Sequence, residues 1–349
     1  MYLMFRNRAL LKFIIPVVLV LICLGIIALV SGFFGDESVS EDSSINSEVI
    51  SEQATDANYV NDAQEAPILQ EGGICIYEIY GQCSCSACMP EVNIIFEQNF
   101  IQLDPSDISR GNLILINNYH IFNPEYVGEL ALIADFVTPH FRVSNDEIVI
   151  SEHIVEPLVR MFKTFYYAIG TNNVSVISGF RGLERQQEIL DSNIERMGAA
   201  EARRWVAEPG HSEHHTGLAV DFGFYQYGTL VNFLGVGRTA WFRQNARYYG
   251  FIERYPESST EITGVAHEPW HFRYIGLPHS YFITELGLVF EEYIDFLKQH
   301  CSEEPFIAEF KGIEYMIFFT GESEILMPIG SYFDISGTNT DGFVVTIRG

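Results

Sequence analysis

The chain has 349 residues, of which 48% are hydrophobic and 14% aromatic, so it can hold a folded domain with further segments attached. Its formal net charge at pH 7 is −26. Because binding to a polyphosphate requires clustered Lys and Arg side chains, this charge argues against a nucleic acid as partner. The sequence gives no indication of the oligomeric state.

Residues 11–34 form an almost wholly apolar stretch, in which Lys12 is the only charge. About 20 apolar residues in a helix span a hydrocarbon core of roughly 30 Å. A signal peptide is the alternative, but the stretch exceeds the usual apolar region and shows no clear small-x-small cleavage site. Basic residues precede the stretch and acidic residues follow it. We therefore predict a cytoplasmic tail (1–10), a transmembrane helix (11–34) and an extracytoplasmic location for the rest, anchored at the cell membrane.

An acidic linker is predicted over residues 35–72. Ten Asp or Glu and no Lys or Arg lie between Asp36 and Glu71, among small polar residues. Such a composition buries too little apolar surface to offset the entropy of ordering, so the linker is expected to be disordered. Repulsion between its like charges would hold the folded part away from the lipid surface.

A cysteine-rich segment is predicted over residues 73–99. It contains Cys75, Cys83, Cys85 and Cys88. Disulfides are the more common outcome outside the membrane, and four cysteines allow three pairings. A metal or cluster site and reduced thiols are the other interpretations, and the spacing does not choose among them.

The pattern becomes that of a folded domain over residues 100–302. The sequence predicts strands at 113–116 and 174–178 and helices at 152–169, 183–197 and 281–300. Strands and helices follow one another irregularly, without a βαβ rhythm or a glycine-rich nucleotide loop, which predicts an α+β domain. Residues 303–349 change to short β-like runs at 315–319, 324–327 and 342–346 and are predicted to form a small β appendage of unassigned role.

A candidate metal site lies in two segments that are rich in histidine. Residues 218–223 alternate, with Leu218, Val220 and Phe222 on one face of a predicted strand and Asp221 on the other. His214 precedes this strand, and His271 of the later segment can complete a His-Asp-His set with a fourth position for water, as catalytic zinc requires. Glu268, three residues before His271, is placed to take a proton from that water.

These residues resemble a known signature. Ser-x-His-x-x-Gly-x-Ala-x-Asp over 212–221 and Glu-x-Trp-His over 268–271 are similar to the motifs of the VanY-like D-alanyl-D-alanine carboxypeptidases. A third motif, Ser178-Gly179-Phe180-Arg181 with Gln186 following, resembles the family's S-G-Y-R-S-x-x-x-Q. It departs from that pattern at Phe180, which keeps the ring without the hydroxyl, and at Gly182.

The resemblance implies a fold and a set of roles. The fold would be that of the Hedgehog/DD-peptidase group, an antiparallel sheet with flanking helices. Zn²⁺ would be bound by His214, Asp221 and His271, and Glu268 would be the general base. The resemblance also implies that Arg181 contacts the substrate and steadies the oxyanion, and that Ser212 and Gln186 line the substrate groove.

The resemblance implies hydrolysis of the terminal D-Ala-D-Ala bond of peptidoglycan stem peptides or precursors. Two alternatives stay open on the sequence alone. One is a peptidoglycan endopeptidase on the same fold, and the other is a zinc-stabilised module that binds cell-wall peptide without cutting it. The preference for D-Ala-D-Ala over D-Ala-D-lactate, and any part in antibiotic resistance, are not predicted.

Overall fold

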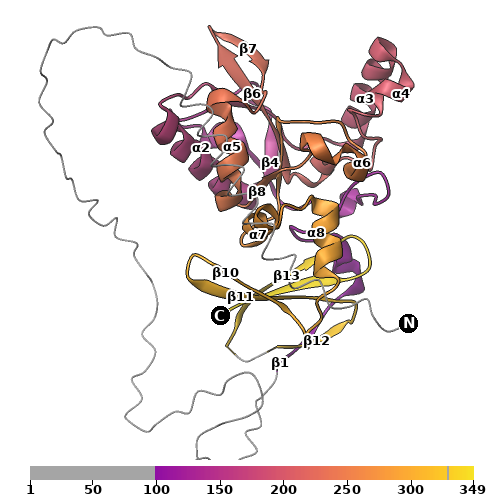
Figure 1. Ribbon diagram of the computed structural model, residues 1–349. Helices are drawn as coiled ribbons and strands as arrows, with labels where there is room; N and C mark the ends of the chain where they lie inside the picture. Colours follow the sequence, from indigo (N-terminus) through magenta and orange to yellow (C-terminus); the bar gives the residue numbers. More distant parts are fainter. Residues whose placement is uncertain (1–98, 328–329) are drawn as a thin grey trace, which may run out of the picture. The chain divides into compact units, whose positions relative to one another are not determined.

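The computed structural model describes residues 99–327 and 330–349 (Figure 1). The predicted cytoplasmic tail, transmembrane helix and acidic linker lie outside the described residues, as do the four clustered cysteines. Within the described ranges, no helix has both the length and the apolar content needed to cross a bilayer.

A six-stranded mixed sheet carries the predicted motifs. Its order is β3-β5-β6-β9-β8, and β7 pairs with the distal end of β6. The strands are β3 (Arg142–Val143), β5 (Val174–Ser178), β6 (Ala219–Gln226), β7 (Thr229–Asn232), β8 (Phe251–Glu253) and β9 (His271–Tyr274). The α+β prediction is confirmed, but the expectation of a purely antiparallel sheet is wrong at one edge. There β3 and β5 are parallel, because the connection between them includes a helix that returns the chain in the same direction.

The helices of this part cover the sheet and flank its motifs. They are α2 (Val155–Ile169), α3 (Leu183–Met197), α4 (Ala199–Ala202), α5 (Ala240–Asn245) and α6 (Thr260–Thr263). The predicted helices at 152–169 and 183–197 are confirmed as α2 and α3, with a 3₁₀ turn replacing the first residues of the former. Two short strands, β2 (Leu130–Leu132) and β4 (Val149–Ser151), form a separate antiparallel pair.

The main apolar core lies between one face of the sheet and helices α2 and α5. Val220 and Phe222 of β6 pack there with Phe162 of α2 and Phe242 of α5. Their burial follows from the alternation of β6, which points Val220, Phe222 and Phe224 to this face. The opposite face therefore carries the polar residues of the same strands, which include Asp221 of β6 and His271 of β9.

The C-terminal residues form a second, four-stranded antiparallel sheet of order β10-β11-β14-β13. Helices α7 (His279–Leu286) and α8 (Phe290–Leu297) pack against it through a shared cluster that includes Phe282, Ile294, Ile317 and Val344 (Figure 1). The strands are β10 (Phe306–Phe310), β11 (Ile313–Thr320), β13 (Tyr332–Gly337) and β14 (Phe343–Arg348), while β12 (Glu324–Met327) pairs with β1 (Asn99–Gln102). The three predicted β runs are confirmed, and the helices share an apolar core with this sheet.

Two predicted elements are wrong. Residues 113–116 are buried but form no strand, because their backbone bonds to side chains and irregular segments: the Leu113 N–H donates to Ser336 Oγ and the Leu115 N–H to Thr338 O. The predicted helix over 281–300 is two helices, α7 and α8. Gly287 separates them with a φ of 67°, a left-handed conformation that terminates α7.

Buried His279 predicts a pH dependence of stability. Its Nδ1 lies 2.9 Å from Tyr293 Oη, and its Nε2 lies 2.9 Å from Thr346 Oγ1. Burial lowers the pKa of His279 to about 3. Since the unfolded ring titrates near 6.5, the stability contributed by the neutral form is present above that pH and is lost as pH falls toward 3.

Between pH 6 and 4, His279 should lower the free energy of unfolding by at most about 1.4 kcal/mol per pH unit of acidification. Urea unfolding of the wild type and of His279→Gln at several pH values measures this contribution. All other titrating groups are present in both proteins, so the difference between them is due to His279. The unfolding free energy of the variant should fall less steeply with acidification. Equal slopes for the two proteins would refute the assignment.

Candidate active site

His214 is fixed by a tight turn before β6. Residues Glu213–Thr216 form one 3₁₀ turn that ends at Gly217, whose φ is 72°. A Cβ at Gly217 would come within 3.0 Å of the Ser151 backbone nitrogen, so a side chain is excluded there. The His214 Nδ1 donates to Gly179 O at 2.6 Å, which leaves Nε2 as the nitrogen that faces the site.

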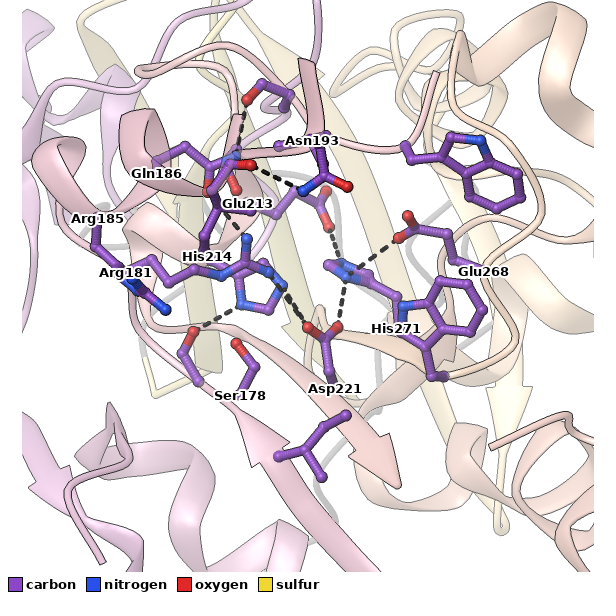
Figure 2. A pocket seen from close by; sticks show the side chains of 18 of the residues that line it. Ser178, Arg181, Arg185, Gln186, Asn193, Glu213, His214, Asp221, Glu268 and His271 are labelled. Atoms are coloured by element: carbon purple, nitrogen blue, oxygen red, sulfur yellow. Dashed lines mark hydrogen bonds and ion pairs between the residues drawn. The ribbon is translucent and has the colours of Figure 1, made fainter. Parts of the chain in front are cut away.

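Asp221 and His271 are brought together by strand pairing. They are direct cross-strand partners in the antiparallel pair β6–β9, so their side chains leave the same face of the sheet. His271 Nδ1 lies 3.0 Å from Asp221 Oδ1. One atom each of His214, Asp221 and His271 lie within 4.8 Å of one another, and Figure 2 shows the three side chains converging.

The environment of this triad fits a cation. His214 Nε2 is buried and has no hydrogen-bond partner among the described residues, although it lies 3.2 Å from Asp221 Oδ2. Burial, reinforced by Arg181, lowers the pKa of His214 to about 4, so its ring is neutral and can be a ligand. Burial alone would raise the pKa of Asp221, but His214 and His271 hold it well below its usual value. Two imidazoles and a carboxylate form a ligand set that zinc accepts.

Glu268 lies at the edge of the triad. The turn from Glu268 to His271 is closed by the His271 N–H, which donates to Glu268 O at 3.0 Å. This turn places Glu268 Oε2 3.8 Å from His271 Nδ1. Burial raises the pKa of Glu268 to about 8, against the opposing effect of His271. A carboxylate with a raised pKa beside a metal site is suited to accept a proton near neutral pH.

Arg181 projects into the site from the loop after β5. Its Nη2 donates to Asp221 Oδ2 at 3.2 Å and its Nη1 donates to Gln186 Oε1 at 3.0 Å. Gln186 is buried in α3 and donates in turn to Ala207 O at 2.8 Å. The guanidinium is therefore held in one orientation, and its buried Nε has no hydrogen-bond partner among the described residues.

All of these residues line one cavity of about 1060 Å³. The structure places the predicted groove residues Ser212 and Gln186 in its wall, the latter also bonded to Arg181. The sequence analysis missed further lining residues, which include Arg185, Asn193, Arg196, Trp205 and Tyr255. Arg185, Asn193 and Arg196 recur at helical spacing along α3, a signal that would have pointed to them once α3 was placed at the site.

The neighbouring histidines are held by other contacts. His215 Nδ1 lies 2.6 Å from Arg181 O, and its Nε2 accepts from the Gly210 N–H at 3.0 Å. His211 bonds to Asn117 O, and His267 lies 3.3 Å from Glu253. These rings are therefore held by scaffold contacts, and the triad is the one cluster of potential metal ligands found in the described residues.

The triad supplies two imidazoles and an ionised carboxylate as metal ligands. A proton acceptor, Glu268, and a positive charge, Arg181, lie in the same cavity. This arrangement is that of a metal-dependent hydrolase. Comparison with known proteins gives the family. The model of VanY, D-alanyl-D-alanine carboxypeptidase, matches residues 147–277. A D-alanyl-D-alanine carboxypeptidase of Enterococcus faecium is 32% identical over 246 residues, which cover 69% of this chain and 76% of the relative.

Two further relatives agree. The bifunctional D-Ala-D-Ala dipeptidase and D-Ala-D-Ala carboxypeptidase VanXYC of Enterococcus gallinarum is 40% identical over 131 residues, 36% of this chain and 69% of that protein. The crystal structure of the vancomycin resistance D,D-dipeptidase VanXYg, in complex with a D-Ala-D-Ala phosphinate analogue, has a TM-score of 0.64 at 32% identity. It covers 72% of this chain and 99% of that chain. The chain belongs to the VanY family of D-alanyl-D-alanine carboxypeptidases and is an enzyme, as the motifs predict.

Proposed function

We propose that this chain is a zinc D,D-carboxypeptidase that removes the terminal D-alanine from peptidoglycan stem peptides or their precursors. The observation that carries the proposal is the convergence of Glu268 and Arg181 on the ligand triad within one cavity. Family membership supports the bond specificity, since the relatives are described as D-Ala-D-Ala carboxypeptidases.

The ligands are assigned from their orientation. His214 Nε2, the Asp221 carboxylate and His271 Nδ1 would hold the zinc ion. When bound, zinc supplies Lewis acidity that polarises the scissile carbonyl and lowers the pKa of water. Glu268 accepts the proton of the attacking water and then delivers it to the amine of the departing D-alanine. Arg181, held by Gln186 and Asp221, presents its positive charge to the carbonyl oxygen as negative charge develops there.

Product analysis tests the proposal and its endopeptidase alternative. The full chain is incubated with stem peptides ending in D-Ala-D-Ala or D-Ala-D-lactate, with and without a chelator, and the products are identified by mass spectrometry. We expect release of free D-alanine from the first peptide and its loss with chelator. Cleavage at an internal bond without release of D-alanine would favour the endopeptidase. Intact peptide despite bound zinc would refute the proposal.

The orientation of Arg181 gives a more specific expectation. Arg181→Lys keeps the charge but cannot reach Asp221 and Gln186 together, so the group facing the carbonyl oxygen is no longer held. Loss of one oxyanion donor typically lowers kcat by about 10²–10³-fold, and we expect that range with zinc content unchanged. Arg160→Lys, which alters an exposed ion pair with Glu156, is the matched control. A kcat of Arg181→Lys close to wild type would exclude this role.

We also propose that residues 11–34 anchor the enzyme in the cell membrane, with the peptidase part outside. The apolar length of this segment and its flanking charges support the proposal. An anchored enzyme would meet peptidoglycan at the membrane surface. Protease treatment of intact protoplasts tests the orientation, because an external peptidase part is digested and a cytoplasmic one is protected.

A further inference from the structure

A buried cluster of four charged residues lies behind the ligand triad. Arg254 Nε donates to Glu213 Oε1 at 2.8 Å, and Arg273 Nη1 donates to the same oxygen at 3.0 Å. Arg254 also forms a two-armed pair with Glu291, at 2.8 and 2.6 Å. The side chains of Glu213, Arg254 and Arg273 are fully buried, and two positive charges face two negative ones.

The second oxygen of Glu213 faces the metal site. Glu213 Oε2 lies 3.3 Å from His271 Nε2, while His271 Nδ1 points toward Asp221 and the cavity. An ionised carboxylate can only accept, and each nitrogen of the His271 ring faces one, Asp221 at Nδ1 and Glu213 at Nε2. With a metal ion in place of the proton at Nδ1, the remaining ring proton is on Nε2 and is donated to Glu213. The lone pair of the ring is then on Nδ1, the nitrogen that belongs to the triad.

The cluster is connected to structure beyond the main sheet. Arg273 Nη2 donates to Asn112 O at 3.1 Å and to Ile114 O at 2.9 Å, which fixes the buried irregular segment described above. Glu291 belongs to α8, whose neighbouring residues pack on the C-terminal sheet. The orientation of Glu213 therefore depends on contacts from several parts of the chain.

A buried cluster of charges destabilises the fold if one of its charged partners is missing. Buried ion pairs often add little net stability compared with apolar replacements, because each charge must lose its hydration. Glu213 is the only member of the cluster whose side chain contacts the side chain of a triad ligand. Its geometry is that of an outer group that sets the tautomer and ring orientation of a metal-binding histidine.

We propose that Glu213 is a positioning residue for the metal centre: it accepts the Nε2 proton of His271 and holds Nδ1 toward the metal. Arg254 and Arg273 hold Glu213, and Glu291 holds Arg254. This inference rests on the proposed function, because it concerns the same zinc site. Helix α8, which packs on the C-terminal sheet, would then help to orient His271, because its Glu291 holds Arg254 and Arg254 holds Glu213.

Zinc affinity and the state of the His271 ring test the inference. Zinc dissociation constants of the full chain are measured by competition with a chelator for the wild type, Glu213→Gln and Glu291→Gln. We expect Glu213→Gln to bind zinc about 10–100-fold more weakly, as loss of such an outer contact typically does, and Glu291→Gln to lose less. Glu285→Gln breaks an ion pair with Arg247 away from the cavity and should bind zinc like the wild type.

The ring is observed separately, in the zinc-loaded wild type labelled with ¹⁵N-histidine. We expect His271 to carry its proton on Nε2 and to bind metal through Nδ1. Wild-type zinc affinity in a folded Glu213→Gln protein, or a proton on Nδ1 of His271, would overturn the inference. If Glu213→Gln does not fold, the wild-type ring signal decides. Failure of the wild type to bind zinc would instead refute the proposed function.

Discussion

Replacement of Glu268 by Gln is expected to lower kcat by about 10³-fold while zinc stays bound. The amide has nearly the same size as the carboxylate but cannot accept the proton of the attacking water. General acid–base groups typically contribute about 10²–10⁴-fold. Glu268 lies outside the ligand triad, with its nearest oxygen 3.8 Å from His271 Nδ1, so the loss should appear in kcat and not in the zinc dissociation constant. Rates of D-alanine release and zinc content of the same preparation measure both.

Glu261→Gln is the matched control for this experiment. Glu261 is an exposed glutamate of α6, a few residues before Glu268 in the chain, and it does not line the cavity. It should retain wild-type rates. A Glu268→Gln protein with kcat within tenfold of the wild type would show that another group accepts the proton. Loss of zinc from this variant would mean that Glu268 is itself a ligand.

Replacement of His214 by Ala is expected to abolish zinc binding and, with it, D-alanine release. The remaining two ligands, Asp221 and His271, cannot form the three-residue set that catalytic zinc sites use. Since loss of an outer contact alone costs about 10–100-fold in metal affinity, removal of a ligand should cost more than ~100-fold. Metal analysis after dialysis and a chelator competition measure the change.

His211→Ala is the matched control, because His211 precedes His214 by three residues and bonds to Asn117 O outside the triad. It should keep one zinc per chain and most of the activity. Full zinc occupancy in His214→Ala would contradict the ligand assignment. Loss of zinc in both variants would show instead that the whole segment around residues 211–216 is sensitive to substitution.

The local pattern of the sequence was sufficient to predict the strand that carries Asp221. Alternation in β6 separates apolar Val220 and Phe222 from Asp221, and the structure shows the same division between core and site. The helices α2 and α3 also follow from their periodicity. The sequence predicts that His271 shares a ligand set with Asp221, but not that the two residues are direct cross-strand partners, since strand register between distant segments is set by the whole sheet.

The remaining features depend on contacts between distant segments. Residues 113–116 have the composition of a strand, but Ser336 and Thr338 take their backbone hydrogen bonds. Glu213 occupies a position that the motif leaves unspecified, and nothing local marks it as buried. Its partners Arg254 and Arg273 follow 41 and 60 residues later. Such a cluster is recognisable only when the sheet and α8 have been placed.

Zinc titration of the metal-free full chain tests the central claim most directly. The protein is stripped with chelator, and D-alanine release from a peptide ending in D-Ala-D-Ala is followed as zinc is added. We predict that activity is absent without metal, rises linearly and reaches its plateau at one zinc per chain. Release of D-alanine that is unaffected by chelator, or zinc-loaded protein that leaves the peptide intact, would contradict the account.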